Sequence, residues 1–405
     1  MKTFLKKYQL FVKITAAIVL GIFIGTFLPY EITEFFIAIN IIISKLLNFS
    51  IPLIIIAFVT KGISSLESSG KMLGITTCIS YVFMICASFL SYFTATTLFP
   101  KFLTDAQNNI FESVTNPVGS VFSQLSQINI APIMDVVPAL ILAFILGIGV
   151  STIKGSHIKE LFNEFHDIIN LMVQKLIVPI LPLYVLGIFA KMTASGQVFK
   201  ILSVFSKVFA IIIVLHLLTL VMQYLLAGLI SHKNPFKLIK NIIPAYLSAV
   251  ATQSSVAVIP ITIDCSKRNG VSSNIADFVL PLCSTIHLSG SVISITACSV
   301  AVMLVSGKPV EFSTMVPFMM ILGIMMVAAP GVPCGAILAA SGILQSILGF
   351  DPAMLSLIIA RHVAQDGFGT ACNVTGDGSI AVILDTLNRK IFNKSKKNMS
   401  PEIQL

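Results

Sequence analysis

Two aspartates, Asp366 and Asp377, lie in an apolar part of the chain, near the start and at the end of the run Gln365–Asp377 (QDGFGTACNVTGD). A carboxylate inside a membrane is costly unless it meets a cation, a substrate ammonium group or another partner. Ionisable groups in such segments are usually functional. We therefore expect both aspartates to bind positively charged ligands. The alternative is a structural pair inside the protein, such as Asp366 with Arg361 or His362.

Two stretches that precede these aspartates are expected to fold as helical hairpins with tips inside the membrane. Residues 242–263 and 315–350 are apolar runs interrupted near the middle, by Thr252–Ser255 and by Pro330–Gly335. Each is followed by a span that is polar at its centre and is expected to be broken; these spans are residues 281–291 and 361–377. Non-helical backbone at that depth must be shielded by protein or line a wet cavity. A hairpin plus a broken span, occurring twice, is typical of inverted-repeat transporters with a binding site near the midplane.

The composition is that of a polytopic all-α membrane protein without a soluble domain. Of the 405 residues, 56% are hydrophobic and 11% are charged, against about 25% charged residues in an average soluble domain. Apolar runs close to the length needed to cross a bilayer recur through the N-terminal half. We expect these spans at residues 10–29, 35–60, 72–99, 136–152, 168–189 and 198–230. The polar stretch 101–135 is expected to be an external loop.

The basic residues indicate topology rather than nucleic-acid binding. The net charge of +9 comes from lysines and arginines that gather in short connectors and at the ends of the chain. Under the positive-inside rule these connectors and both termini lie in the cytoplasm. We expect a multi-pass protein of the cytoplasmic membrane, in contact with lipid, whose first apolar run is a retained anchor rather than a signal peptide. The seven cysteines lack metal-binding spacing and are expected to be buried free thiols.

Three motifs resemble the glutamate-transporter family of dicarboxylate/amino acid:cation symporters: Asn373–Asp377 (NVTGD), Gly331–Pro333 (GVP) and Ser254–Ser255. The resemblance covers essentially the whole chain. It implies a homotrimer with eight transmembrane helices, two re-entrant hairpins and inverted repeats, in which a transport domain slides through a scaffold like an elevator.

On this resemblance the first, second, fourth and fifth spans form the scaffold. Residues 1–235 then hold the six N-terminal spans, which are the scaffold and trimerisation helices plus the third and sixth spans of the transport domain. Residues 236–390 form the C-terminal transport core, and residues 391–405 form a cytoplasmic tail.

The resemblance also implies the substrate-binding residues. Asp366 matches the aspartate that binds the substrate α-amino group, and Asn373 matches the asparagine that binds the α-carboxylate together with a hairpin serine, here Ser255. An acceptor for ammonium and donors for carboxylate suit a zwitterion. The whole expected substrate-binding set is Ser254, Ser255, Ser291, Gly331, Val332, Asp366, Gly369, Thr370 and Asn373.

Two departures from the family pattern argue against an acidic substrate. Gly369 stands where acidic-substrate members have an arginine, and Gln253 stands where some members supply an arginine from the first hairpin. Without a guanidinium group, a second substrate carboxylate would be buried unpaired. We therefore expect a small neutral amino acid and place the chain in a neutral amino-acid-like branch.

The family's cation sites are only partly retained. Its Asn-Met-Asp-Gly-Thr motif reads His287–Ser291 (HLSGS) here, and its third-span ligands fall at Met84 and Ile85, which offer no oxygen to a hard cation. A second site, built from the carboxylate of Asp377 and backbone carbonyls, is expected to remain, and a third would use carbonyls of the second hairpin. The expected sodium ligands are Cys283, Thr285, His287, Asn373 and Asp377. No organic cofactor is expected.

The resulting expectation is a secondary symporter of a small neutral amino acid coupled to sodium, and not an enzyme. One alternative is coupling to protons through His287, because histidine changes charge near neutral pH, with a carboxylate or another amino acid as substrate. A remote alternative is an intramembrane hydrolase using Ser254 or Ser255 with His287 and Asp366, although no G-x-S-x-G elbow is present. A channel is the other remote alternative.

Overall fold

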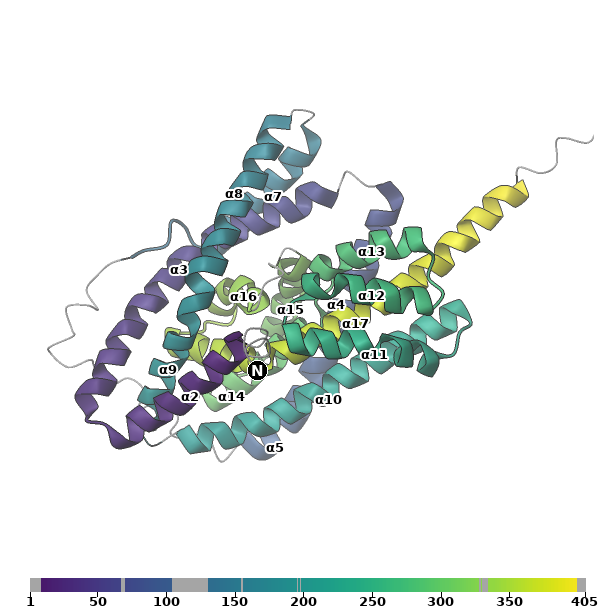
Figure 1. The fold of residues 1–405 in the computed structure, drawn as a ribbon. Coiled ribbons are helices and arrows are strands. Elements are labelled where there is room, and N and C mark those ends of the chain that lie inside the picture. The colour runs from purple at the N-terminus through teal and green to yellow at the C-terminus, as the bar shows by residue number, and fades with distance from the viewer. Residues whose placement is uncertain are drawn as a thin grey trace, which may run out of the picture.

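The computed structural model describes residues 9–66, 70–103, 130–153, 156–194, 196, 198–327, 329 and 334–398 (Figure 1). Within these ranges every regular element is a helix, as the sequence predicts. Several of these helices are long and apolar enough to cross a membrane, and shorter apolar helices accompany them. Large apolar side chains such as Val214, Leu218 and Leu229 face outward from one of the long helices, which is the pattern of a surface in contact with lipid or a partner subunit.

The N-terminal half contains the expected spans. Most of the predicted external loop, residues 104–129, lies outside the described residues. The helices are α2 (Gln9–Phe27), α3 (Tyr30–Leu66), α4 (Gly70–Leu98), the short α5 (Pro100–Leu103), α7 (Val136–Thr152), α8 (Ser156–Met172), the π-turn η4 (Val173–Ile177), α9 (Val178–Ala194) and α10 (Val198–Ser231).

The C-terminal half contains two hairpins and two long spans. The first hairpin is α11 (Pro235–Thr252) with α12 (Ser255–Arg268), and it is followed by α13 (Ser273–Ile286) and α14 (Ser289–Val305). The second hairpin is α15 (Phe312–Val327) with α16 (Gly335–Ser346), and it is followed by α17 (Pro352–Asn398).

The helices pack in two groups. In the first, α3 packs against α7, α8 and α9, and α2 packs against α9. In the second, α4 and α10 pack against α14 and α17, together with α11, α12 and α13. In Figure 1, α2, α3, α8 and α9 lie toward the left of the view and α11, α12 and α13 toward the right. Helices α4 and α10, at the positions of the third and sixth expected spans, therefore pack with helices of the C-terminal half.

The tip of the first hairpin follows from local backbone chemistry. Helix α11 ends because Gln253 adopts the left-handed conformation (φ 52°), while its N–H still bonds the carbonyl of Ala249. Ser254 is extended, and its hydroxyl accepts a hydrogen bond from the N–H of Ala257 at 3.4 Å, so it caps α12. The reversal predicted at Thr252–Ser255 is confirmed.

The span after this hairpin is broken, also as predicted. Helix α13 ends at Ile286, although the N–H of His287 still reaches the carbonyl of Cys283. His287 and Leu288 have extended or irregular backbone angles, and α14 begins at Ser289. The break therefore lies in the middle of a mostly buried span, where it leaves polar backbone groups for other elements to satisfy.

The expectation of a second broken span is wrong, because α17 is continuous from Pro352 to Asn398. No proline follows Pro352 within this helix. Its glycines serve close packing instead of a turn: a Cβ on Gly376 would lie 2.6 Å from Oε1 of Gln223, and one on Gly378 would lie 2.6 Å from the Tyr224 hydroxyl. The same helix extends through residues 391–398 of the expected tail, while residues 399–405 lie outside the described residues.

The cysteine prediction is correct in part. All seven thiols are free, and five of them are buried, whereas Cys78 and Cys86 on α4 are exposed. The two exposed thiols lie on an apolar helix whose outer face also exposes Val82 and Phe93. A free cysteine behaves as a small hydrophobe, so exposure on such a face is consistent with an apolar environment.

Candidate functional site

One face of α17 carries most of the predicted site. Asp366, Thr370, Asn373 and Asp377 are spaced i, i+4, i+7 and i+11, which places them along one side of the helix over roughly 16 Å. All four residues are at most 8% exposed. This face, which we call the α17 polar face, meets α14 and the start of α16.

The side chain of Asp366, on α17, lies beside the start of α16, the second helix of the second hairpin. Its Oδ2 accepts a hydrogen bond of 2.9 Å from the N–H of Cys334, the residue that precedes α16. The positive end of a helix stabilises a carboxylate at this place. His362 Nε2 lies 3.5 Å from Oδ1, and of the two partners considered for a structural pair only this histidine is within ion-pair distance.

Asn373 joins α17 to the break in the preceding span. Its side-chain Oδ1 accepts from the N–H groups of Gly290 (2.7 Å) and Ser291 (3.4 Å), and its Nδ2 donates to the Ser291 hydroxyl (3.1 Å). The amide therefore caps α14 in a fixed orientation. It keeps a second Nδ2–H for a ligand, and the structure brings the predicted pair Asn373 and Ser291 together.

The first hairpin reaches the same part of α17. A Cβ on Gly367 would lie 2.9 Å from the carbonyl of Val250 and 3.4 Å from Cγ of Gln253, so the hairpin tip packs against the turn that carries Asp366. The Ser255 hydroxyl donates to the carbonyl of Ser284 at 3.0 Å. Gly331 and Val332, predicted from the second hairpin, lie outside the described residues.

Space is available beside Gly369. A Cβ at this position would meet its nearest atoms, the Gly290 carbonyl and the Ser294 hydroxyl, at 3.8 Å, which is ordinary contact. By contrast, a Cβ on Gly290 would lie 2.4 Å from the carbonyl oxygen of Gly369 and 2.6 Å from Cβ of Cys372. Gly290 therefore permits the close packing of α14 on α17, whereas Gly369 leaves room for a Cβ atom.

Asp377 is paired with His287. Their Oδ1 and Nδ1 atoms are 2.9 Å apart, and the two side chains are 2% and 0% exposed. On the other side of the imidazole, Nε2 lies 3.5 Å from Nε2 of Gln223. The carboxylate predicted to bind sodium thus has an imidazole beside it.

The remaining predicted cation ligands make contacts within their own helix. The carbonyl of Cys283 accepts the N–H of His287, and the Thr285 hydroxyl donates to the carbonyl of Leu282 at 2.8 Å. Among the described residues, no group of three His, Cys, Asp or Glu side chains could hold a metal ion. A sodium site here would therefore need further oxygen ligands, such as backbone carbonyls, and its ligand set stays a prediction.

Met84 of α4 provides a hydrogen-bond partner for the backbone at the break between α13 and α14. The resemblance places one ligand of the lost cation site at this residue. Its sulfur is fully buried and accepts a hydrogen bond of 3.3 Å from the N–H of Leu288. A thioether sulfur is a weak acceptor and not a ligand for sodium. Side-chain sulfur therefore stands where the resemblance places oxygen ligands.

Helix α10 contributes polar groups to the site that were not predicted from the sequence. His216 Nε2 lies 2.9 Å from the carbonyl of Gly290 and 3.1 Å from the Ser294 hydroxyl, and the Tyr224 hydroxyl donates to the carbonyl of Thr375. The available signal was the presence of His216, Gln223 and Tyr224 in an otherwise apolar span. These residues are spaced i, i+7 and i+8 and therefore share one face.

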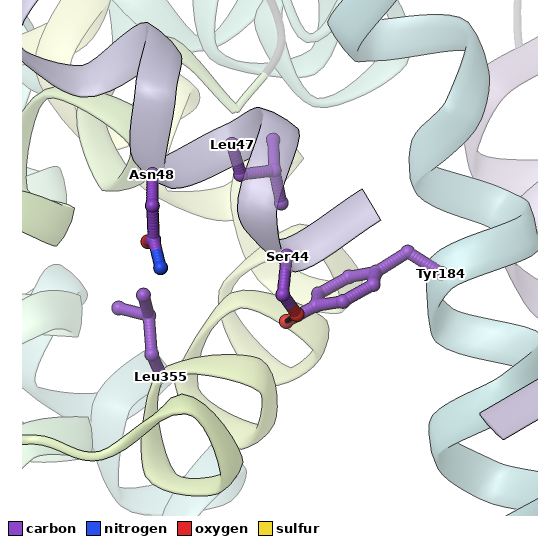
Figure 2. Close-up of a pocket in the computed structure, with 5 residues that line it drawn as sticks. All are labelled: Ser44, Leu47, Asn48, Tyr184 and Leu355. Atoms are coloured by element: carbon purple, nitrogen blue, oxygen red, sulfur yellow. Dashed lines mark hydrogen bonds between the residues drawn. The ribbon is translucent and has the colours of Figure 1, made fainter. Parts of the chain in front are cut away.

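The pocket in Figure 2 lies elsewhere, between the two helix groups. It is lined by Ser44, Leu47 and Asn48 of α3, Tyr184 of α9 and Leu355 of α17. The Ser44 hydroxyl lies 3.3 Å from that of Tyr184. The pocket has room for about one water molecule and contains none of the predicted site residues, so it is not a candidate substrate site.

Comparison with known proteins identifies the family. The family model described as sodium:dicarboxylate symporter family matches residues 10–387, almost the whole chain. The chain belongs to the sodium:dicarboxylate symporter family. Like the family, it is a multi-pass membrane transporter of the symporter type and not an enzyme, so the hydrolase interpretation is excluded.

Several proteins to which this symporter-family chain is similar are named as amino-acid transporters. The serine/threonine transporter SstT of Acinetobacter baylyi is 25% identical over 404 residues, which is 96% of this chain and 100% of the relative. Neutral amino acid transporter A of Bos taurus is 27% identical over 275 residues, 66% of this chain and 51% of the relative. Excitatory amino acid transporter 5 of Mus musculus is 32% identical over 169 residues, 42% of this chain and 30% of the relative.

Proposed function

We propose that this family member is a secondary active symporter of a small neutral amino acid, coupled to a sodium gradient across the cytoplasmic membrane. The observation that carries the proposal is the chemistry of the α17 polar face. It presents one carboxylate, Asp366, for an ammonium group, and the hydroxyl of Thr370 and the amide of Asn373 for a carboxylate. Among the described residues of α17, no arginine or lysine belongs to this face; its one neighbouring basic side chain is the imidazole of His362, beside Asp366.

The single arginine of this part of α17 does not change the argument. Arg361 precedes Asp366 by five residues, which places it about 140° around the helix, and its guanidinium lies over the ring of Phe209, 4.9 Å from the centroid. It is therefore directed away from the α17 polar face. A second substrate carboxylate at Gly369 would be buried without a guanidinium partner. The names of the serine/threonine and neutral amino acid transporters agree with this specificity.

Sodium is proposed to bind at Asp377 with backbone carbonyls of Cys283, His287 and Asn373, and a further site would involve Thr285. A second candidate, coupling to protons, is favoured by the 2.9 Å contact between His287 and Asp377. An imidazolium there supplies the positive charge that a sodium ion would otherwise bring to the carboxylate.

The larger assembly belongs to the same proposal. A homotrimer with eight spans, two inverted repeats and cytoplasmic termini would operate as an elevator. The two packing groups support this because α4 packs on α13, α14 and α15, and α10 packs mainly on α11, α14 and α17, with a smaller contact to α9. The group of α2, α3, α7, α8 and α9 is then the scaffold.

Uptake into proteoliposomes tests the function. Purified protein is reconstituted, and uptake of labelled neutral amino acids is measured under an inward sodium gradient, a pH gradient or neither. We expect uptake of at least one small neutral amino acid that requires a gradient, and its dependence on sodium or pH separates the two coupling candidates. No gradient-driven uptake of any neutral amino acid would refute the proposal.

Matched carboxylate variants identify the binding residue in the same assay. Asp366→Asn removes the charge that the substrate ammonium requires, and we expect uptake to fall to the level of empty liposomes. Asp264→Asn removes an exposed carboxylate of α12, and we expect near wild-type uptake.

A further inference from the structure

A second polar cluster lies on α17, on another side from the α17 polar face. Arg361 and Gln365 are one helical turn apart, and they are only 7% and 1% exposed. Among the described residues, none of the three guanidinium nitrogens of Arg361 and neither polar side-chain atom of Gln365 has a hydrogen-bond partner. The one contact of the guanidinium that the structure shows is with the ring of Phe209.

This arrangement leaves a positive charge without compensation. Arginine does not deprotonate in proteins, and a guanidinium removed from water needs a counter-charge or several hydrogen bonds. A cation–π contact with one phenylalanine is too weak to provide this. No described carboxylate lies within ion-pair distance of Arg361. Something other than the described protein groups must therefore compensate the charge.

The groups around Arg361 are donors or neutral rather than acidic. From α10 come Phe209 and His216, and His216 directs Nε2 toward the carbonyl of Gly290. Helix α14 contributes the buried thiol of Cys298, which lies within electrostatic range of the guanidinium. On α17 itself, the neighbour His362 lies beside Asp366, which occupies the other face.

We propose that Arg361 and the amide of Gln365 bind a small monovalent inorganic anion, such as chloride, in the interior of the C-terminal helix group. The planar fork of a guanidinium and an adjacent amide N–H₂ supply only donors toward such an ion. The anion is separate from the substrate. Gly369, the place proposed for the substrate side chain, follows Arg361 by eight residues, which is roughly 12 Å along the helix, and the Arg361 side chain tilts further toward the N-terminus, so a solution anion fits better than a substrate carboxylate.

Thermal stability of the purified protein tests the site. The melting temperature Tm is measured at constant sodium and ionic strength while chloride replaces gluconate, an anion too large for an enclosed site. Binding to the folded state raises Tm in a saturable manner. We expect this rise for the wild type and a loss of apparent chloride affinity of at least about tenfold in Arg361→Gln, because charge-assisted hydrogen bonds disappear.

Gln365→Glu is the variant that tests the anion site most specifically. It places a carboxylate one turn from Arg361, where i,i+4 side chains meet, and so replaces the bound anion by a protein group. We expect Tm in gluconate to rise to the wild-type value in chloride, and the chloride response to vanish. This variant retains Arg361, so the test does not depend on whether Arg361→Gln folds. Lys207→Gln, which removes an exposed lysine of α10, is the matched control with an unchanged chloride response.

Three results would overturn the proposal. The first is a wild-type Tm that is the same in chloride and gluconate, and the second is a chloride response that Gln365→Glu retains. The third is stabilisation in gluconate by L-aspartate that Arg361→Gln abolishes, since the anion would then be a ligand carboxylate. Neutral amino acids tested in the same gluconate samples report on substrate binding separately, so failure of the anion site is distinguishable from failure of the transport proposal.

Discussion

The pair formed by His287 and Asp377 yields a quantitative prediction. His287→Gln removes the imidazole, while the Asp377 carboxylate remains 2% exposed with its partner at 2.9 Å deleted. Breaking a buried pair by removing one partner costs about 3–5 kcal/mol. Each kcal/mol shifts Tm by about 2–4 °C for chains of 150–250 residues and by less for longer ones. We therefore expect Tm in sodium-free buffer to fall by roughly 3–10 °C.

Sodium should restore part of this loss if the imidazole occupies a place that a cation can take. A ligand present at one hundred times its dissociation constant stabilises the folded state by about 2.7 kcal/mol. The assay is differential scanning fluorimetry with a thiol-reactive dye, in sodium or in a large organic cation at equal ionic strength. We expect a larger sodium-dependent shift in His287→Gln than in the wild type.

The matched control is His157→Gln, which changes an exposed histidine of α8 and should leave Tm unchanged. A His287→Gln variant as stable as the wild type without sodium, or one with no added response to sodium, would refute the reasoning about a buried cationic partner for Asp377.

Four further changes test other parts of the structure. Gly369→Arg has room at its Cβ and should add uptake of L-aspartate while reducing that of neutral amino acids; unchanged selectivity in an uptake competition would contradict the placement of the substrate side chain at Gly369. Asn373→Ala removes the cap on α14, which costs about 0.5–2 kcal/mol, and should lower substrate affinity far more than Asn241→Ala, whose side chain caps no helix in the site. Gly290→Ala places a methyl group 2.4 Å from the Gly369 carbonyl oxygen and should lower Tm, whereas Gly74→Ala, with open space, should not. A short bifunctional thiol reagent joining cysteines at Asn48 and Gln345, whose side chains bond across α3 and α16 at 3.0 Å, should stop uptake; unaffected uptake would argue against sliding between these helices.

The hairpins could be predicted because their signals are local. A polar interruption in an apolar run marks the reversal at Gln253, and the polar centre of the next span marks the break at His287 and Leu288. The same rule failed for α17. There Asp366, Asn373 and Asp377 are satisfied by partners on other helices, so the backbone can stay helical, and the glycines are used for packing.

The contacts of the site could not be predicted from the residues alone. His287 and Asp377 are 90 positions apart, and Met84 lies 204 positions from the N–H that it accepts. Which face of α10 turns toward α14, and hence the role of His216, depends on how the long helices pack. The resemblance supplied residue types and positions for the site, whereas the pairing of Asp377 with an imidazole follows from His287, which stands where the family motif has an asparagine.

Ligand-induced stabilisation tests most directly whether the α17 polar face recognises an amino-acid zwitterion. The measurement compares the Tm shift from a panel of neutral L-amino acids with the shift from their N-acetyl derivatives, which lack the ammonium group. At least one neutral amino acid should stabilise the wild type, its N-acetyl derivative should not, and Asp366→Asn should lose the response. Equal stabilisation by the free and the acetylated forms would contradict the account, because Asp366 would then have no part in binding.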